Sequence, residues 1–256
     1  MNQNPLLDPA IHLSDRCLVR VGGDDAMDFL QNVITNDMRR AAPGKLLYAC
    51  LLMPQGFYLH DFFIGHDNDG YFLDCETARV DDLLRRFTIF KLRAKVTFAR
   101  AIGNIYSAGQ GLDDPRLSAL GKRFYTNEML AAVKPVSDYH DLCIEQGVPC
   151  GSLAMKPERD TMADVNLELL NAVAWDKGCF IGQEVAARMY NRSSAKRRLY
   201  IAGRETPFTA GEKLGDAGEV RQISSTGKKA IVQLKVTALA AIGGEIIIRS
   251  PEYLSP

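Results

Sequence analysis

The chain lacks paired cysteines and has few histidines. Its six cysteines include no Cys-x-x-Cys pair, and only four histidines are dispersed over 256 residues. Several cysteines lie in apolar runs, where cysteine usually acts as a small buried hydrophobe. This usage is typical of a compartment that keeps thiols reduced. We therefore expect a cytoplasmic protein.

Long apolar runs and an excess of one charge are also absent. No stretch reaches the roughly 18 apolar residues that a membrane span requires. Residues 1–13 lack the basic and apolar segments of a signal peptide and the Arg-rich character of a mitochondrial transit peptide. Lys plus Arg and Asp plus Glu both total 31, so the net charge is zero. We therefore expect neither a membrane nor a nucleic-acid partner.

The composition that remains is that of an ordinary globular protein, with 46% hydrophobic and 24% charged residues. Apolar spacing predicts amphipathic helices over 26–34 and 80–87. The segment from Gln183 can also become helical. Strand-like runs lie at 17–21, 46–52, 57–64, 71–75, 95–99 and 102–107. This alternation of hairpins with single helices predicts an α+β fold.

The character of the sequence changes near residue 196. Short strand candidates at 198–202, 212–214, 219–224, 229–236 and 244–249 are separated by glycines. This pattern is typical of a small all-β sandwich or barrel. We therefore place one domain at 1–195 and a second, small β domain at 196–256.

The most informative segment is Lys177-Gly178-Cys179-Phe180-Ile181-Gly182-Gln183-Glu184. The positive charge of Lys177 and the start of a helix at Gln183 favour the thiolate form of Cys179, which performs chemistry and binds metals. The alternative is a buried structural cysteine in a tight turn. Iron–sulfur clusters and zinc normally take several protein ligands. A metal on Cys179 therefore needs a partner protein or a small thiol to complete its coordination.

The charged residues that follow this segment either belong to a ligand site or are solvated surface residues. Glu184 and Arg188 are spaced for a helical ion pair, which is either part of a site or a solvated surface pair. Six basic residues follow without an acidic residue from Val185 to Arg204. They suit a ligand's carboxylates or phosphates, or else form a solvated connector. The six are Arg188, Arg192, Lys196, Arg197, Arg198 and Arg204.

Asp61 is a further candidate because it interrupts an apolar run. Strand alternation places it on the face of Leu59 and Phe63. It is either a buried carboxylate with a partner or a residue on an exposed strand face.

These blocks together resemble the YgfZ/GcvT-like family, over nearly the whole chain. The Lys-Gly-Cys and Gly-Gln-Glu block is the most specific part, and supporting blocks lie at 21–26, 29–37, 46–56 and 86–96. The resemblance implies a folate-binding fold with a ferredoxin-like part and a C-terminal β-barrel around a central channel. It also implies that tetrahydrofolate binds and that the protein assists iron–sulfur cluster assembly with a cluster carrier or client protein.

The resemblance also implies roles for single residues. Cys179 becomes the functional thiol, with a transient iron–sulfur cluster shared with the partner. The candidate cofactor-binding residues are Lys177, Gln183, Glu184, Arg188 and Arg192. Phe180 and Ser193 depart from the usual tyrosine and glycine of the family.

An alternative function is a tetrahydrofolate-dependent aminomethyltransferase or methyltransferase. Such an enzyme needs a carboxylate near the reactive nitrogens of folate. In this resemblance Asp61 lies where the aminomethyltransferases carry an acidic pair, which makes it a candidate catalytic residue. The sequence therefore leaves open whether the protein is an enzyme, with an accessory factor as the leading hypothesis.

Overall fold

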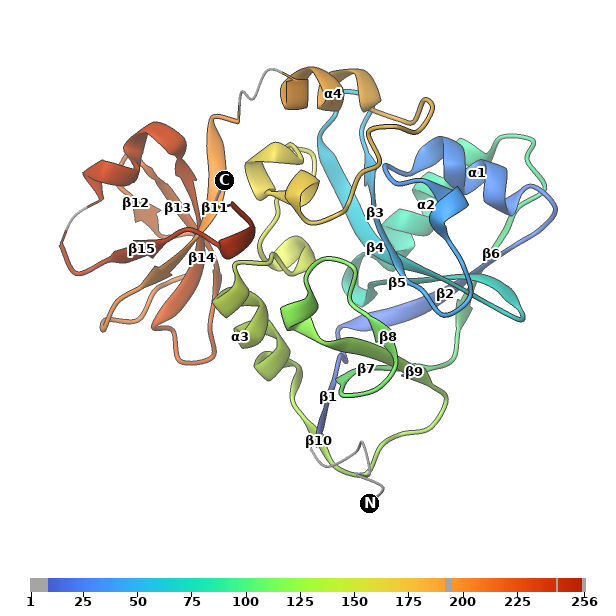
Figure 1. Cartoon of the computed structure of the whole chain (residues 1–256), viewed down its shortest axis with the longest axis horizontal. Coiled ribbons are helices and arrows are strands. Elements are labelled where there is room, and N and C mark those ends of the chain that lie inside the picture. The colour runs from blue at the N-terminus through green and yellow to red at the C-terminus, as the bar shows by residue number, and fades with distance from the viewer. Residues whose placement is uncertain (1–8, 192–194, 243, 255–256) are drawn as a thin grey trace. The chain divides into compact units, whose positions relative to one another are not determined.

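The computed structural model describes residues 9–191, 195–242 and 244–254. It divides into two compact units, each built from segments that are distant in the sequence (Figure 1). The first unit comprises Met1–Leu51, His60–Val136 and Asn171–Ile181, and the second comprises Leu52–Leu59, Ser137–Leu170 and Gly182–Pro256.

The first unit is organised on a sheet with the strand order β3-β4-β5-β2-β6. The pairs β4·β5, β5·β2 and β2·β6 are antiparallel. The strands are β2 (Arg16–Gly22), β3 (Leu47–Leu52), β4 (Tyr58–Asp67), β5 (Gly70–Glu76) and β6 (Thr97–Ala101). Helices α1 (Ala26–Val33) and α2 (Val80–Lys91) confirm the two helices predicted from apolar spacing.

Both helices cover the same face of this sheet. The ring of Phe87 on α2 lies 5.5 Å from that of Phe29 on α1 and 5.9 Å from that of Phe62 on β4. Phe98 of β6 joins the same aromatic cluster. Because side chains alternate along a strand, the neighbours of Phe62 in β4 point to the opposite face of the sheet. That face carries Asp61.

A second sheet of the first unit has the order β10-β1-β7-β9-β8. Its strands are β1 (Ala10–His12), β7 (Asn104–Ala108), β8 (Leu112–Asp113), β9 (Lys122–Thr126) and β10 (Val133–Lys134). The strand predicted at 102–107 begins two residues later than expected. Gly103, with φ of +156°, turns the chain there, and Ile102 is 91% exposed.

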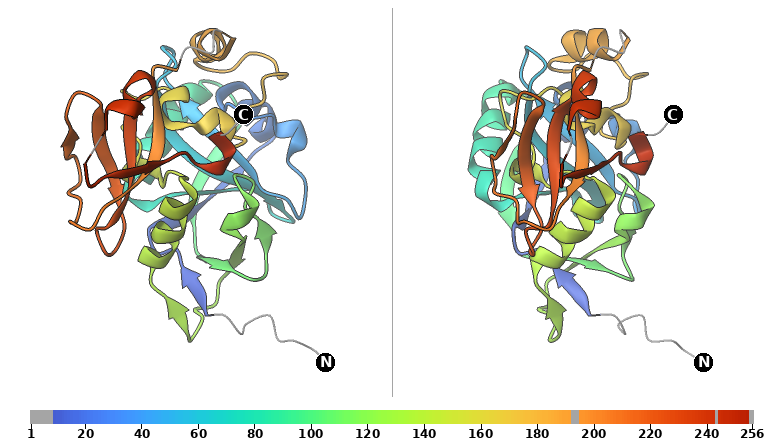
Figure 2. Two further views of the ribbon diagram at one scale, coloured as in Figure 1. Left: turned by 60° about the vertical axis from the view of Figure 1, so that its left-hand side comes forward. Right: turned by 90° about the vertical axis from the view of Figure 1, so that its left-hand side faces the viewer.

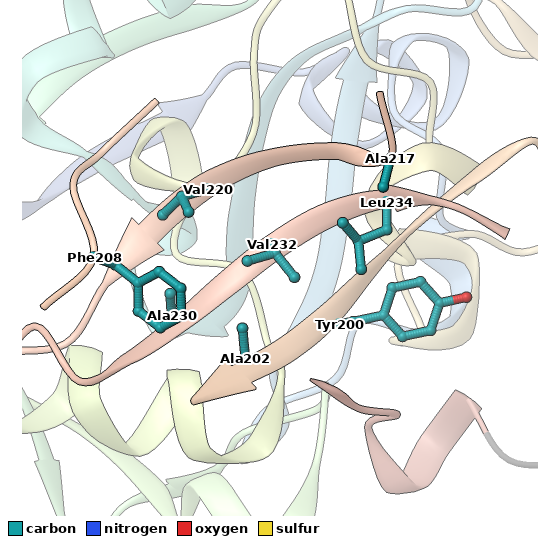
Figure 3. Packing of buried hydrophobic residues seen from close by; sticks show 8 residues of the cluster. All are labelled: Tyr200, Ala202, Phe208, Ala217, Val220, Ala230, Val232 and Leu234. Carbon is teal, nitrogen blue, oxygen red and sulfur yellow. The ribbon is translucent and has the colours of Figure 1, made fainter. Parts of the chain in front are cut away.

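The second unit contains an antiparallel sheet with the order β12-β13-β14-β11-β15. Its strands lie side by side in orange and red in Figure 2 and are β11 (Arg197–Gly203), β12 (Lys213–Leu214), β13 (Gly218–Ile223), β14 (Lys229–Lys235) and β15 (Ile247–Arg249). Figure 3 shows its buried core, formed by Tyr200, Ala202, Phe208, Ala217, Val220, Ala230, Val232 and Leu234. Closure of this sheet into a barrel around a channel stays a prediction.

The second unit also carries α4 (Gln183–Asn191), which begins at the predicted residue, and most of α3 (Val136–Gln146). The prediction missed α3, although buried Tyr139 and Cys143 are spaced by one helical turn. None of the helices in the described part of the chain combines the length and apolar character needed to cross a membrane. The several sheets and the four α-helices found among the described residues confirm the α+β fold class.

Candidate functional site

Cys179 is exposed in a loop that precedes α4. The residues beside it are buried, since Lys177 is 5% exposed and Phe180 is 7% exposed. The Lys177 ammonium lies 5.3 Å from the centre of the Phe180 ring. The loop is therefore anchored on both sides of the cysteine, while the thiol is open to solvent. A buried structural cysteine, the alternative interpretation of the sequence, does not describe this position.

Lys177 provides the main anchor of this loop. Its ammonium donates hydrogen bonds to the backbone oxygens of Gln31 at 2.6 Å, Ile34 at 2.8 Å and Asn36 at 2.8 Å. A lysine ammonium has three N–H donors, so each donor here has a carbonyl partner. A cofactor contact through this group has to replace one of these bonds.

Two consecutive polar residues, Thr35 and Asn36, hold the segment that leads to the cysteine, and Asp37 follows them. The Thr35 hydroxyl donates to the backbone oxygen of Ala172 at 2.5 Å, and the Asn36 side chain donates to that of Asn171 at 2.8 Å. Asp37 accepts hydrogen bonds from the backbone and side chain of Arg39. These three residues belong to a block that carries the family resemblance. The contacts of Thr35 and Asn36 explain this part of the block as the surface to which the cysteine loop attaches.

Burial lowers the pKa of Lys177 to about 8, and the nearby Asp37 carboxylate acts in the opposite direction. Most of the lysine is therefore protonated at neutral pH and retains all three donors. The predicted influence of this charge on the Cys179 thiol stays a prediction.

The two glycines of the motif differ in their surroundings. Gly182 has φ of +80°, and an added Cβ would lie 2.4 Å from the backbone oxygen of Met53. An added Cβ on Gly178 would have no heavy atom within 4 Å. Close packing therefore requires glycine at position 182, whereas Gly178 leaves open space one residue before Cys179.

The remaining motif residues lie on the second unit. Gln183 and Glu184 are in the first turn of α4, and Arg188 is one turn further along. The Glu184 carboxylate and Arg188 guanidinium lie 3.7 Å apart, with both side chains mostly exposed. Arg192 lies outside the described residues. The binding roles of all four stay predictions.

Two of the basic residues that follow are engaged within the second unit. Arg198 pairs with Glu168 and donates to the backbone oxygen of Ala163 at 2.9 Å. Arg204 pairs with Glu212 at 2.6 Å. By contrast, Lys196 and Arg197 are exposed and line a hollow together with Asp164, Met189, Ala195, Lys235, Val236 and Thr237.

Asp61 lies inside the first unit and is 4% exposed. Its carboxylate accepts a hydrogen bond from the Tyr48 hydroxyl at 3.0 Å. Burial, together with the Asp61 charge, raises the pKa of both Tyr48 and Cys50. Of the two alternatives that the sequence left open for Asp61, the buried carboxylate with a partner is the one observed. The backbone oxygen of Tyr48 accepts from Asn36, which links this region to the anchor of the cysteine loop.

A buried polar cluster on the same face of the sheet escaped the sequence prediction. Asp74 accepts from Arg16 and Arg123, each at 2.7 Å, and from the Tyr125 hydroxyl at 3.1 Å. Arg123 also contacts Asp114, and its guanidinium lies 3.7 Å from the centre of the Phe63 ring. The only available signal was the presence of Asp74 within the apolar strand 71–75.

No group of three or more His, Cys, Asp or Glu side chains within 9–191, 195–242 and 244–254 is placed to hold a metal ion. Cys179, Lys177 and Asp61 all belong to the first unit, but they occupy different surroundings. The first is exposed, the second is bonded to backbone, and the third is buried beside Tyr48.

No protein-family model matches the chain. The mitochondrial iron–sulfur cluster assembly factor IBA57 of Mus musculus is 26% identical to it over 259 residues, covering 85% of this chain and 72% of that protein. The Homo sapiens counterpart is 27% identical over 228 residues, covering 73% of this chain and 64% of that protein. The glycine cleavage system aminomethyltransferase T of Bartonella henselae has a similar fold, with a TM-score of 0.70 and 15% identity over 90% of this chain and 78% of that one. The YgfZ/GcvT-like resemblance is confirmed.

These relatives correct one expectation drawn from the sequence. The predicted cytoplasmic location is contradicted, because the mouse, human and Neurospora crassa relatives are all named as mitochondrial proteins. Unpaired cysteines indicate only that thiols stay reduced, and this criterion does not separate one reducing compartment from another.

Proposed function

We propose that this YgfZ/GcvT-like chain assists iron–sulfur cluster assembly or repair through Cys179, together with a cluster-carrying partner. The observation that carries the proposal is an exposed thiol on a loop whose flanking residue Lys177 is fixed by three hydrogen bonds. The relatives named as iron–sulfur cluster assembly factors support the same process.

A partner is required by the coordination chemistry of the cluster. Iron–sulfur clusters are held mainly by several cysteine thiolates. The described residues contain no group that supplies three or more ligands, so Cys179 acts as one ligand and the partner provides the others. In this role the cluster is cargo that the two molecules hold in common.

The position of the thiol suits such a transfer. A ligand held on a fixed loop loses little conformational freedom when the partner binds, which lowers the cost of forming the shared site. The open space beside Gly178 leaves room for a second protein to approach.

We also propose that tetrahydrofolate binds to the first unit near Asp61. The chemistry fits, because the pterin ring carries N–H donors and a carboxylate accepts several hydrogen bonds at once. Asp61 already accepts from the Tyr48 hydroxyl, and a bound ligand would donate to the same carboxylate. Since Asp61 is 4% exposed, a ligand that reaches it has to displace the side chains that cover it. Calorimetric titration with tetrahydrofolate tests this part, and an absence of saturable binding removes it.

Genetic complementation tests the role of Cys179. In a strain that lacks the gene, the wild-type chain should restore the activity of iron–sulfur enzymes, and Cys179→Ser should not. Serine keeps the size of the side chain but is a poor ligand for iron. Cys150→Ser is the matched control, since Cys150 is a partly exposed cysteine of the second unit. Equal rescue by wild type and Cys179→Ser would reject the mechanism.

An aminomethyltransferase is the second candidate, and buried Asp61 beside Tyr48 is the observation that favours it. This function predicts turnover of an aminomethyl donor with tetrahydrofolate. Asp61→Asn should then abolish turnover, and Cys179→Ser should retain it. Measured turnover with this pattern would replace the cluster-assembly proposal.

A further inference from the structure

Two cysteines outside the predicted site face each other across neighbouring strands of the first unit. Cys17 on β2 is directly opposite Cys75 on β5 in the antiparallel register. Their sulfur atoms lie 3.8 Å apart. Directly opposed residues in antiparallel strands have Cα atoms about 4.5–5.5 Å apart, which lies inside the range that a disulfide spans. A bond between the two sulfurs therefore needs side-chain rotation rather than backbone movement.

The two thiols differ in their access to solvent. Cys17 is partly exposed, whereas Cys75 is 2% exposed. Cys17 also lies one residue before the stretch of β2 that pairs with β6, which begins at Leu18. A small oxidant from solvent therefore reaches Cys17 first, and the Cys75 sulfur lies next to it on the neighbouring strand.

Hydrogen bonds and nearby charges also give the two thiols different pKa values. A hydrogen bond with the Cys75 thiol lowers the pKa of Cys17 to about 7, and the Thr77 hydroxyl and the Arg16 and Arg100 guanidiniums act in the same direction. The hydrogen bond with Cys17, together with burial, raises the pKa of Cys75. At neutral pH the exposed member of the pair is therefore the better nucleophile.

We propose that Cys17 and Cys75 form a thiol oxidation site that reacts with hydroperoxides. The Cys17 thiolate attacks one peroxide oxygen, the O–O bond breaks, and the departing alkoxide takes a proton to become an alcohol, or water when the oxidant is hydrogen peroxide. The Cys75 sulfur then attacks the sulfur of the Cys17 sulfenic acid. The S–O bond breaks, and hydroxide leaves with the Cys75 proton as water. Two electrons pass from the pair of thiols to the peroxide.

An ion pair lies directly beside the two cysteines. Arg16 precedes Cys17 and Asp74 precedes Cys75, and these two neighbours form an ion pair of 2.7 Å. A disulfide would join β2 to β5 beside this pair. Oxidation therefore makes the first unit more resistant to unfolding, because the closed loop restricts the unfolded chain.

Three other cysteines differ from Cys17 in their exposure. Cys50 and Cys143 are fully buried, and Cys179 is exposed without another cysteine near it in the sequence. Peroxide that reaches Cys179 is expected to oxidise its thiol to the sulfenic acid or further to the sulfinic acid. The products at the two sites are therefore distinguishable.

The test uses the full-length Cys179→Ser chain, treated with hydrogen peroxide under native conditions. Intact mass should fall by two hydrogen atoms, and peptide mapping should recover a reducible Cys17–Cys75 link. The melting temperature should rise and return to its starting value with dithiothreitol. A chain whose Cys17 and Cys75 stay reduced, or whose Cys17 becomes sulfinic acid without a link, overturns the proposal.

Two further variants, each made in the Cys179→Ser chain, test which cysteines take part in the oxidation. Cys75→Ser should stop at a sulfenic acid on Cys17 that dimedone traps, with no disulfide formed. Cys150→Ser, which removes the other partly exposed cysteine, should leave the rate of link formation unchanged within about twofold. If Cys75→Ser fails to fold, the linked peptide of the parent chain still decides the question. A Cys17–Cys75 disulfide that forms only in denatured protein would contradict an oxidation site in the folded chain.

Discussion

The Nζ atom of Lys177 lies 2.8 Å from the backbone oxygen of Ile34, the residue that caps the C-terminal end of α1. The last carbonyl groups of a helix have no partner inside the helix, and a lysine ammonium satisfies them while it complements the helix dipole. The lysine of the Lys-Gly-Cys motif thus fastens the cysteine loop to α1. Its position explains how a loop without regular structure can hold a thiol in one place.

Removal of the ammonium should loosen this attachment. Lys177→Met keeps the length and apolar stem of the side chain but leaves three carbonyl groups without their donor. We expect the free energy of unfolding to fall by about 3 kcal/mol, since each buried group that loses its partner costs about 1–3 kcal/mol. Urea denaturation measures the change. Lys45→Met, at an exposed lysine, is the control and should stay within about 0.5 kcal/mol of wild type.

The two glycines that flank Cys179 should respond differently to alanine. Gly182→Ala places a Cβ 2.4 Å from the Met53 oxygen at a φ of +80°, so it should cost about 2–3 kcal/mol of stability. Gly178→Ala meets no atom within 4 Å and should change stability by less than about 0.5 kcal/mol. Thermal unfolding of the two variants side by side checks this contrast. Equal losses would show that the loop packs in another way.

The buried carboxylate of Asp74 should be critical for the first unit. Asp74→Asn leaves the partly buried Arg16 and the buried Arg123 without the charge that both contact at 2.7 Å. Loss of one partner from a buried ion pair costs about 3–5 kcal/mol. Asp67→Asn is the control, because Asp67 pairs with Arg20 on the surface and such pairs contribute at most about 1 kcal/mol. A small effect of Asp74→Asn in denaturant titrations would contradict the expected role.

His60 should make the protein sensitive to mild acid. Burial and the nearby Arg79 charge lower its pKa from 6.5 to about 4, although Asp82 at 2.8 Å opposes them. Between these two pH values the unfolded chain binds a proton that the folded chain does not. The free energy of unfolding should therefore fall as the pH drops from 6.5 to 4, by up to about 3 kcal/mol.

Replacement of His60 tests this assignment. His60→Gln stays neutral and should remove most of that pH dependence, as measured by urea denaturation at several pH values. His66→Gln, at a partly exposed histidine, should retain it. An unchanged pH profile in His60→Gln would assign the acid sensitivity to other groups.

The sequence predicted the elements that depend on local spacing. Apolar residues at helical intervals placed α1 and α2, and apolar runs between turn residues placed most strands of the two sheets that contain β4 and β14. The helix expected from Gln183 is observed as α4, and the burial of Asp61 is one of the two alternatives that its apolar neighbours left open. Short strands such as β1 and β10 have two or three residues, which is too little for a periodic signal.

By itself the sequence therefore determined the fold class, the family resemblance and the choice of Cys179 as the thiol to test. Only the tertiary structure decided what surrounds each candidate. Lys177 bonds to Gln31, a residue 146 positions away, and Cys17 meets Cys75 across 58 positions. Periodicity reports the conformation of neighbours in sequence. It carries no information on which distant segments pack together, because that choice depends on how the whole chain buries its apolar faces and pairs its polar groups.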